Sequence, residues 1–398
     1  MIPIRIVPGR HIEIFAGAGG MALGCRMAGF ASTELHDIDP TACATLRWNT
    51  LSRSPTLIGA VCEQDVRETV WSQHAGKVGL LAGGAPCQPF SLGGVHEGHR
   101  DSRNLFPEIV RAVADVRPAA VLVENVRGIL REDFAPYLTY VLRQLADPSI
   151  VRKKRESWRT HSKRLKQHQD AKGYTPEYHV SCDCLNAADF GVPQLRHRAF
   201  IVATDAKNLP RITLPIATHS RQALLVAQAR REYWERRSLH PPRLTRPLLR
   251  FPDDDTRHPW VTVRDVISDL PEAAAEECSA WSNHWSIAGA RSYPGHSGSR
   301  LDGPAKTIKA GVHGVAGGEN TVVLDSGRIR YLTLREAARL QTFPDDHFFV
   351  GARSGVVRQI GNAVPCKLAE AVARPIAQAL LRREALRQRK RHLTPTHP

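Results

Sequence analysis

A cysteine among small residues is the first side chain in this sequence that could carry out covalent chemistry. Cys87 lies within Gly83–Ser91, shortly after the apolar run Val78–Leu81. A thiolate is a strong nucleophile, and parallel sheets place their active sites at the carboxyl ends of the strands. A buried and inert cysteine is the commoner alternative. The glycines continue through Gly93-Gly94, which favours an exposed loop and a reactive thiol.

An acid and two arginines lie beside two further apolar runs. Glu124 follows Ala119–Val123, so we expect its carboxyl group at the carboxyl edge of the same sheet, unless it only caps a helix. Arg196 and Arg198 precede Ala199–Ala203, and their spacing lets both side chains face one side of an extended chain. Their guanidinium groups could hold a phosphate or a carbonyl oxygen, although exposed arginines taken singly are more often solvated.

A glycine-rich turn near the start of the chain could hold a nucleotide-like ligand. Phe15–Gly24 follows the apolar run Ile12–Phe15 and opens a helix over Met21–Gly29. Glycines allow a sharp turn and a close approach of the backbone to a ligand. Asp37 follows Gly17 by 20 positions, which suits a ribose hydroxyl. Nicotinamide cofactors and S-adenosylmethionine both use such sites, and a glycine turn without a ligand is the plain alternative.

These side chains need a sheet to position them, and the sequence predicts one. The four apolar runs named above are expected strands, and helices are expected between them at Met21–Gly29 and Leu105–Val116. Alternation of strands and helices predicts a parallel sheet with helices on both faces. We therefore assign the chain to the α/β class.

Three later segments depart from this alternation. Residues 152–172 hold nine Lys or Arg and two acids, which predicts an exposed helix or a mobile basic insert. The periodicity fades over residues 209–329, which are expected to form a separate irregular domain. Helical periodicity returns at Thr333–Leu340 and Cys366–Leu386. We expect a catalytic domain over 1–208 that carries the basic insert, the irregular domain over 209–329, a hinge over 330–357, and a return to the first domain with a basic tail over 358–398.

The composition excludes several classes of protein. The 398 residues are 42% hydrophobic and 24% charged, which is unlike a disordered or fibrous chain. The net charge of +16 favours a polyanionic partner, most often nucleic acid. No apolar run reaches the roughly 18 residues of a membrane-spanning helix, and no secretory signal is visible. We expect a cytoplasmic protein that does not associate with membranes.

The cysteines predict neither a disulfide framework nor a metal site. All eight are dispersed along the chain, and Cys182-Asp183-Cys184 holds the only close pair. That pair lacks a second pair to complete a zinc site. We therefore expect no metal.

Seven motifs, in their order along the chain, resemble the cytosine-C5 DNA methyltransferase family over nearly the whole sequence. Phe15–Gly24 is similar to the family's S-adenosylmethionine loop, and Pro86-Cys87-Gln88 to its nucleophile motif. The others are Arg100–Phe106, Glu124-Asn125-Val126, Gln194-Leu195-Arg196-His197-Arg198, Arg330–Pro344 and Gly361–Pro365. Any one motif could arise by chance, but seven in family order identify the chain as a member.

This resemblance implies a fold and a reaction. The fold is a Rossmann-like S-adenosylmethionine-dependent methyltransferase sheet, with a second, smaller and irregular target-recognition domain over residues 209–329. The reaction is methyl transfer to C5 of a cytosine that is flipped out of a specific duplex DNA site. Cys87 is expected to bond to C6, Glu124 to share a proton with N3, and Arg198, with Arg196 nearby, to hold O2.

Further roles come from the same resemblance. The implied cofactor contacts are Phe15, Ala16, Gly17, Gly19, Gly20, Asp37, Ile38, Asp65, Pro86, Asn362 and Ala363. The implied DNA contacts are Gln88, Ser91, Arg103 and Gln194. Two positions depart from the family's pattern, because Glu13 stands where Asp is usual and Ile38 stands where an aromatic residue is frequent. We expect adenine to be held by apolar contact with Ile38 and Phe15.

Other functions remain open at this point. An RNA cytosine-C5 methyltransferase would use the same chemistry, although the long segment before Arg330 favours duplex DNA. A nicotinamide dehydrogenase would leave Cys87 and Glu124 unexplained, and a non-catalytic DNA-binding regulator need not keep them. We expect S-adenosylmethionine as cofactor, double-stranded DNA as partner, and a monomer at the nucleoid. We also expect a place in a restriction-modification system beside a separate endonuclease, or an orphan methylase.

Overall fold

The computed structural model describes residues 7–52, 56–86, 104–241, 255–273, 281–290, 297–310 and 320–393. Cys87, Gln88, Ser91 and Arg103 therefore lie outside the described residues. The chain divides into two compact units, which we call unit 1 (residues 1–185, 197–215 and 369–398) and unit 2 (residues 186–196 and 216–368). In the described ranges, no helix combines the length and the apolar character needed to cross a membrane.

Unit 1 is built on a seven-stranded sheet in the described part of the chain, with the order β3-β2-β1-β4-β5-β7-β6. Its strands are β1 (Arg10–Ile14), β2 (Ser32–Asp37), β3 (Ala60–Glu63), β4 (Val78–Gly84), β5 (Ala120–Val126), β6 (Tyr178–Asn186) and β7 (His197–Asp205). The first five strands pair in parallel, and β7 pairs antiparallel to β5. The strand order reverses direction between β1 and β4, which is where open α/β sheets bind ligands.

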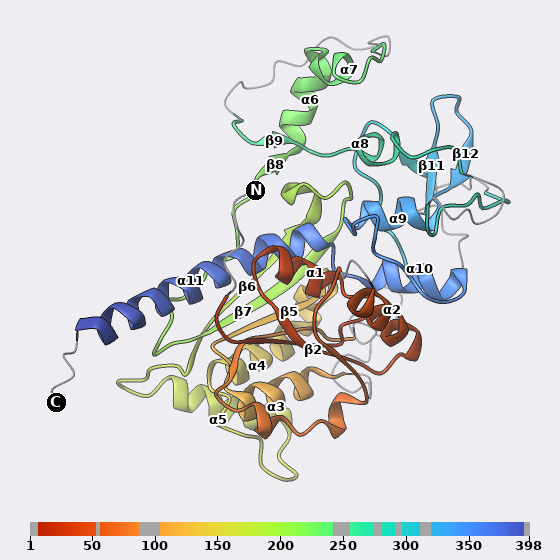
Figure 1. Cartoon of the computed structure of the whole chain (residues 1–398). Helices are drawn as coiled ribbons and strands as arrows, with labels where there is room; N and C mark the ends of the chain where they lie inside the picture. Colours follow the sequence, from red (N-terminus) through yellow and green to blue (C-terminus); the bar gives the residue numbers. More distant parts are fainter. Residues whose placement is uncertain are drawn as a thin grey trace. The chain divides into compact units, whose positions relative to one another are not determined.

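Helices cover both faces of this sheet. The helices of unit 1 are α1 (Gly20–Met27), α2 (Pro40–Leu51), α3 (Phe106–Val116), α4 (Ala135–Ala146), α5 (Trp158–Gln169) and most of α11 (Cys366–Leu393), with short 3-10 helices η1 (Val66–Glu68), η2 (Trp71–His74), η5 (Arg127–Leu130) and η6 (Glu132–Phe134). Figure 1 shows α3, α4 and α5 on one face and α1 and α11 on the other. Both faces of the central strands are buried, as the continuous apolar runs require.

Helix α3 illustrates how the sequence forms an element of this layer. Ile109, Val113 and Val116 recur at helical spacing and are fully or almost fully buried in the core that also contains Val121 of β5. The helix ends where Arg117 adopts the left-handed conformation, with φ of 51°, just before a proline. The expected helix over Leu105–Val116 is thereby confirmed to within one residue.

Two strands are longer than their apolar runs predict. β4 continues through Gly83 and Gly84, and β5 continues through Glu124 to Val126. The extension of β5 follows from its pairing with β7, in which Val126 lies opposite Arg198. Glu124 is therefore a strand residue, and the helix-cap alternative is wrong.

The basic segment 152–172 contains α5, which packs onto the core of unit 1. Leu165 and His161 are completely buried, and His161 Nδ1 lies 3.0 Å from the hydroxyl of Tyr140. Trp158 contacts the rings of Tyr137 and Tyr140. The predicted helix is confirmed, and the alternative of a mobile insert is wrong because one side of the helix is buried.

Unit 2 consists of short elements joined by long connections. Its strands are β8 (His219–Ser220), β9 (His258–Pro259), β10 (Ser299–Arg300), β11 (Thr321–Val323) and β12 (Ile329–Tyr331), and its helices are η7 (Ala187–Phe190), α6 (Arg221–Ala229), α7 (Glu232–Glu235), α8 (Val263–Ile267), α9 (Leu334–Leu340) and α10 (Arg353–Asn362). Such short strands bury little apolar surface themselves, and much of the buried apolar surface of unit 2 comes from its helices, as with Leu224, Trp234 and Leu340.

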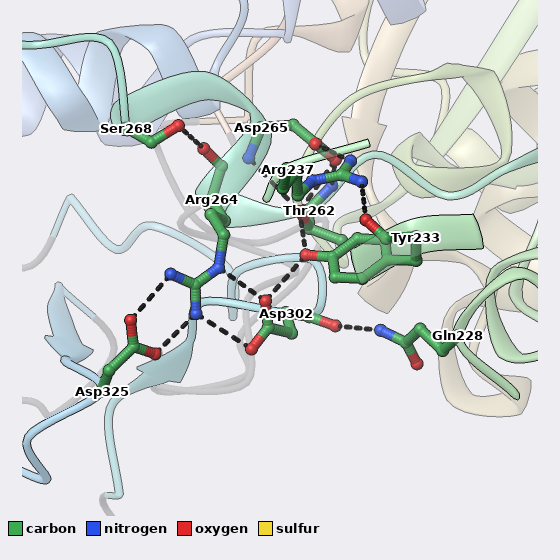
Figure 2. Close-up of polar contacts among 9 residues, drawn as sticks. All are labelled: Gln228, Tyr233, Arg237, Thr262, Arg264, Asp265, Ser268, Asp302 and Asp325. Carbon is green, nitrogen blue, oxygen red and sulfur yellow. Dashed lines mark hydrogen bonds and ion pairs between the residues drawn. The ribbon is translucent and has the colours of Figure 1, made fainter. Parts of the chain in front are cut away.

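A polar network around Asp302 joins several of these elements (Figure 2). Its carboxylate accepts from Arg264 Nε at 2.6 Å and from the Tyr233 hydroxyl at 2.8 Å. Arg264 also pairs with Asp325, and Gln228 donates to the backbone carbonyl of Asp302. The segment Arg300–Ile308 thus supplies the central acid of this network.

Candidate active site

The carboxyl edge of the sheet in unit 1 gathers most of the residues to which the motifs gave roles. Ile14 lies opposite both His36 and Gly83, Asp37 lies opposite Glu63, and Gly84 lies opposite Glu124. The glycine-rich turn after β1, Asp37, Asp65 and Pro86 therefore follow or end neighbouring strands at one edge. β7 runs in the opposite direction, so its first residues, including Arg198, lie at the same edge as the end of β5.

The glycine-rich turn leaves open space beside its backbone. Phe15, Gly17 and Gly19 all have positive φ, at 59°, 53° and 84°. A Cβ at Gly17 would meet no atom within 4 Å, whereas one at Gly19 would lie 2.7 Å from Leu57. Helix α1 follows with Gly19 as its N-cap and with no side chain capping it. The turn thus combines open space beside Gly17 with the amide groups of a helix N-terminus.

Asp37 links this turn to the end of β2. Its Oδ2 accepts from the Gly17 amide at 2.7 Å, and its Oδ1 accepts from the Asp39 amide at 2.8 Å. Burial raises the pKa of Asp37, and the two amide hydrogen bonds oppose that rise. Ile38 follows with 63% of its surface exposed, which is unusual for so apolar a side chain. The carboxylate is positioned rigidly while an apolar surface lies beside it.

Asp65 is the N-cap of η1, and its carboxylate binds Arg67, two residues further along the chain. Its carboxylate accepts from the Arg67 backbone amide at 2.9 Å and forms an ion pair with the Arg67 guanidinium. This hydrogen bonding lowers the pKa of Asp65. The side chain is therefore an anion with a defined orientation at neutral pH.

Glu124 and Arg198 form an ion pair beside the last described residues before Cys87. Arg198 Nε donates to Glu124 Oε1 at 2.7 Å, and both side chains are largely buried. A Cβ at Gly84 would lie only 3.2 Å from Glu124 Oε2. Because residue 84 lacks a side chain, the carboxylate lies close to the backbone that leads through Pro86 to Cys87.

Asn125 fixes the backbone between this pair and Cys87. Its side-chain amide donates to the Ala85 carbonyl at 3.2 Å and is buried. The motif reasoning named Glu124 and Cys87 but gave no role to Asn125 or Gly84. The strand pairing of Gly84 with Glu124 could have indicated both, since a glycine opposite a functional acid leaves room for it.

Arg196 and Gln194 have positions that do not fit the direct contacts expected of them. The Arg196 guanidinium is fully buried in unit 2 and donates to the backbone carbonyls of Ile308, Gly361 and Ala363 at 2.6 to 3.1 Å. Gln194 is also fully buried, and its Nε2 donates to the Leu340 carbonyl at 3.1 Å. A side chain without exposed surface cannot reach DNA, so both are better described as positioning residues.

Asn362 and Ala363 end helix α10 in unit 2. Asn362 is exposed, whereas Ala363 is buried and its carbonyl accepts from Arg196 and from Gln341. Arg335, from the motif Arg330–Pro344, is a second buried arginine whose guanidinium donates to backbone carbonyls, those of Ser282, Pro344 and His347. Burial lowers the pKa of Arg335. The three carboxyl-terminal motifs therefore organise unit 2 internally.

The fold of unit 1 is a Rossmann-like α/β sheet. The structure of S. pombe Dnmt2 methyltransferase matches with a TM-score of 0.56 and 16% identity, over 94% of this chain and 99% of that chain. The Entamoeba histolytica methyltransferase EhMeth matches with a TM-score of 0.54 and 12% identity, again over 94% and 99%. Likeness at such low identity concerns the fold alone.

Sequence comparison then assigns the family. The pattern described as C-5 cytosine-specific DNA methylase matches residues 9–148 and 151–378. Type II methyltransferase M.NgoMIV of Neisseria gonorrhoeae is 32% identical over 380 residues, which cover 93% of this chain and 97% of that protein. Type II methyltransferase M.NaeI of Lentzea aerocolonigenes is 31% identical over 93% of this chain and 75% of that protein. The chain belongs to the C-5 cytosine-specific DNA methylases, as its motifs predicted.

Proposed function

We propose that this enzyme methylates C5 of a cytosine flipped out of a specific duplex DNA site, through a transient bond between Cys87 and C6. The observation that carries the proposal is the Glu124–Arg198 ion pair beside Gly84, three residues before Cys87. Cytosine C5 is too weak a nucleophile to react directly, and addition of a thiolate at C6 converts the C5–C6 edge into an enamine. The ion pair provides an acid and a cation for that addition, and Cys87 would provide the thiolate.

Each side chain has a separate task in this proposal. Cys87 donates its electron pair to C6, and negative charge develops toward N3 and O2. Glu124 shares a proton with N3 and so lowers the barrier. Arg198 binds O2 and holds Glu124 through Oε1, which leaves Oε2 on the side of Gly84. After methyl transfer, loss of the C5 proton and departure of the thiolate restore the aromatic ring.

The residues of unit 1 fit S-adenosylmethionine. When bound, S-adenosylmethionine supplies an electrophilic methyl group. The open space beside Gly17 and the start of α1, which no side chain caps, would receive its amino-acid part. Asp37 would accept from the ribose hydroxyls, the exposed Ile38 would cover the adenine ring, and Asp65 would bind its amino group. Phe15 and Pro86 would line the same space, and we assign Asn362 and Ala363 to it only by family motif.

DNA recognition is assigned to the remaining motifs and to unit 2. Gln88, Ser91 and Arg103 would contact the DNA. The residues that read the sequence would come from 209–329. Because relatives such as M.NgoMIV are named Type II methyltransferases, we infer that this enzyme protects sites from a separate endonuclease.

Mechanism-based trapping tests the proposal. The enzyme is expressed in a host without cytosine methylation, and mapping of 5-methylcytosine gives the target site. Duplex DNA with 5-fluorocytosine at that site should then become covalently attached in the presence of S-adenosylmethionine, because fluorine cannot leave as a cation. Peptide mapping should place the adduct on Cys87, and Cys87→Ser should abolish it while Cys182→Ser should not.

Two results would contradict the proposal. Methylation of the mapped site without any adduct would exclude C5 chemistry, since transfer to an exocyclic nitrogen needs no thiolate. An adduct formed only on transfer RNA that contains 5-fluorocytosine would favour an RNA substrate instead of DNA.

A further inference from the structure

Four side chains of metal-binding types lie near the β3 edge of the sheet, and none of them has been given a role above. Glu34 and His36 lie two positions apart on β2, so their side chains leave the same face of the sheet. Cys62 lies opposite His36 on β3, and His74 ends η2. We call Glu34, His36, Cys62 and His74 the edge cluster.

The distances within the edge cluster suit one small cation. Glu34 Oε2 lies 3.1 Å from His36 Nε2 and 3.3 Å from His74 Nε2. Ligand atoms of Glu34, His36 and Cys62 all lie within 4.8 Å of one another. Tetrahedral zinc, with ligands about 2.0–2.3 Å away, separates its ligand atoms by roughly 3.3–3.7 Å. His74 does not belong to this group of three, so both His74 and Cys62, whose side chain is partly exposed, would have to move to reach one ion.

The surroundings hold both imidazoles in place. His36 and His74 are each 3% exposed, and both rings contact the buried Trp71, with centroid distances of 5.2 Å and 6.2 Å. His74 Nε2 also lies 3.1 Å from the Gln73 side-chain amide, which must rotate away when a metal binds. Glu34 is partly exposed, which gives an ion a path from solvent.

We propose that the edge cluster is a structural zinc site. Two imidazole nitrogens, one thiolate and one carboxylate form a set that zinc prefers, whereas magnesium and calcium take oxygen ligands. Four protein ligands leave no open position, which is typical of structural rather than catalytic zinc. The ion would join β2, the edge strand β3 and η2. β2 ends at Asp37 and β3 leads to Asp65, so the ion would stabilise the part of the sheet that carries two proposed cofactor contacts.

Cobalt substitution of the full-length protein tests this site directly. Apoprotein prepared with a chelator is titrated with Co²⁺ under anaerobic conditions, and Zn²⁺ is then added in competition. The expected result is one equivalent of tetrahedral Co²⁺ with a thiolate-to-cobalt charge-transfer band, which Zn²⁺ displaces. Metal analysis of the protein reconstituted with zinc should give one ion per chain.

Two cysteine variants assign the thiolate. Cys62→Ser should remove the charge-transfer band and weaken zinc binding by more than the roughly 10- to 100-fold that loss of an outer-shell partner causes. Cys182→Ser is the matched control, because Cys182 is also a free, partly exposed cysteine on a strand of the same sheet, and it should change neither. His74→Ala should alter the visible bands of cobalt without removing the thiolate band.

The proposal fails if wild-type protein shows no thiolate band and binds zinc at less than a tenth of an equivalent. It also fails if Cys62→Ser binds both metals as the wild type does. If a variant does not fold, the titration of the wild-type protein with Co²⁺ and Zn²⁺ is sufficient to test the zinc site.

Discussion

In the proposed mechanism, the ion pair between Glu124 and Arg198 carries most of the chemistry at the scale of single residues. The Glu124 carboxylate would take up one proton from solvent as the cytosine enters the site, and that proton would then lie between Glu124 and N3 on the Gly84 side. As charge moves onto the ring during thiolate addition, that proton shifts toward N3. Catalysis by this route depends on the carboxyl group being placed beside the base.

Replacing Glu124 by Gln should lower the turnover number by about 10²- to 10⁴-fold, the range for a lost acid–base group. The amide keeps the shape and can still donate a hydrogen bond, but it cannot transfer a proton to N3. Single-turnover methylation of the target duplex measures the effect. Glu132→Gln is the control, since Glu132 is an exposed acid shortly after the same strand and should keep wild-type turnover. Turnover of Glu124→Gln within about twofold of wild type would remove Glu124 from the mechanism.

Arg196 and Arg198 show where sequence reasoning at this scale succeeds and where it stops. The two-residue spacing predicts a shared face only inside a strand, and β7 begins at His197. Arg196 precedes the strand, and its backbone is bound to Asn186 and Ala187 in unit 2. Only the distant carbonyls of residues 308, 361 and 363 explain its burial. No local pattern reveals contacts with residues more than 100 positions away.

Alanine substitutions should separate these two arginines. Arg196→Ala should destabilise the protein by several kcal/mol, because each buried carbonyl left unsatisfied costs about 1–3 kcal/mol. Arg198→Ala should cost less stability, because Glu124 can take up a proton once its partner is lost, and should reduce methylation strongly. Urea unfolding and single-turnover assays on both variants give the comparison. Equal losses of stability in the two variants would contradict the distinction between a positioning and a catalytic arginine.

At the scale of elements, β1 contains a buried polar pair that the apolar pattern of the sequence did not reveal. His11 and Glu13 are 0% and 2% exposed, and His11 Nε2 lies 3.9 Å from Glu13 Oε2. Burial lowers the pKa of His11 to about 3 and, with the charge of Asp37, raises the pKa of Glu13 well above its ordinary value. Both directions indicate a neutral pair. Glu13, which stands where the family usually has Asp, is therefore uncharged in its buried position.

His11 should make the folded state sensitive to acid. Its folded pKa of about 3 lies below the ordinary value of 6.5, so between these values the unfolded chain binds the additional proton. Stability therefore falls as the pH falls through this window, by about 1.4 kcal/mol per pH unit. Relative to wild type, His11→Gln should lose that dependence in urea unfolding between about pH 6 and pH 4. The raised pKa of Glu13 opposes this loss of stability at low pH, and it does so in wild type and in His11→Gln alike. Parallel stability curves for the two proteins would contradict a buried neutral His11.

The elements themselves were the most predictable part of the structure. Apolar runs located β1, β4, β5 and β7, because strands buried on both faces consist of continuous apolar residues. Their ends were less predictable, since pairing with β7 extends β5 past Glu124. The edge cluster escaped detection for a related reason. Its members lie on three elements between positions 34 and 74, and no short spacing in the sequence marks them.

At the scale of the whole molecule, the net charge of +16 raises the question of which surface carries the excess basic residues. One candidate is the exposed side of α5 and the segment before it. Lys154, Arg159 and Lys163 are exposed there, while Leu165 and His161 hold the opposite side in the core. Deleting residues 152–172 would therefore uncover apolar surface. Charge substitution is the cleaner test of whether this side faces DNA.

Changing Lys154, Arg159 and Lys163 together to Gln should make DNA binding less sensitive to salt. Each lost phosphate contact reduces the slope of log K against log salt by about 0.9. Fluorescence anisotropy over a range of salt concentrations measures that slope. The control variant changes Lys77, Lys207 and Arg211 to Gln. These exposed residues lie just before β4 and just after β7, at the ends of these strands that are away from the candidate active site. Equal slopes for the α5 variant and wild type would show that α5 does not face the DNA.

The division into units has a consequence for how the enzyme is made. Unit 1 is assembled from three stretches of chain, and its last contribution is residues 369–393 of α11, where Val372, Ile376 and Leu380 are almost completely buried. A ribosome must synthesise all of unit 2 before these residues emerge. Until then the surface that these side chains cover stays exposed on the nascent chain. The core of unit 1 is therefore complete only after α11 has been synthesised.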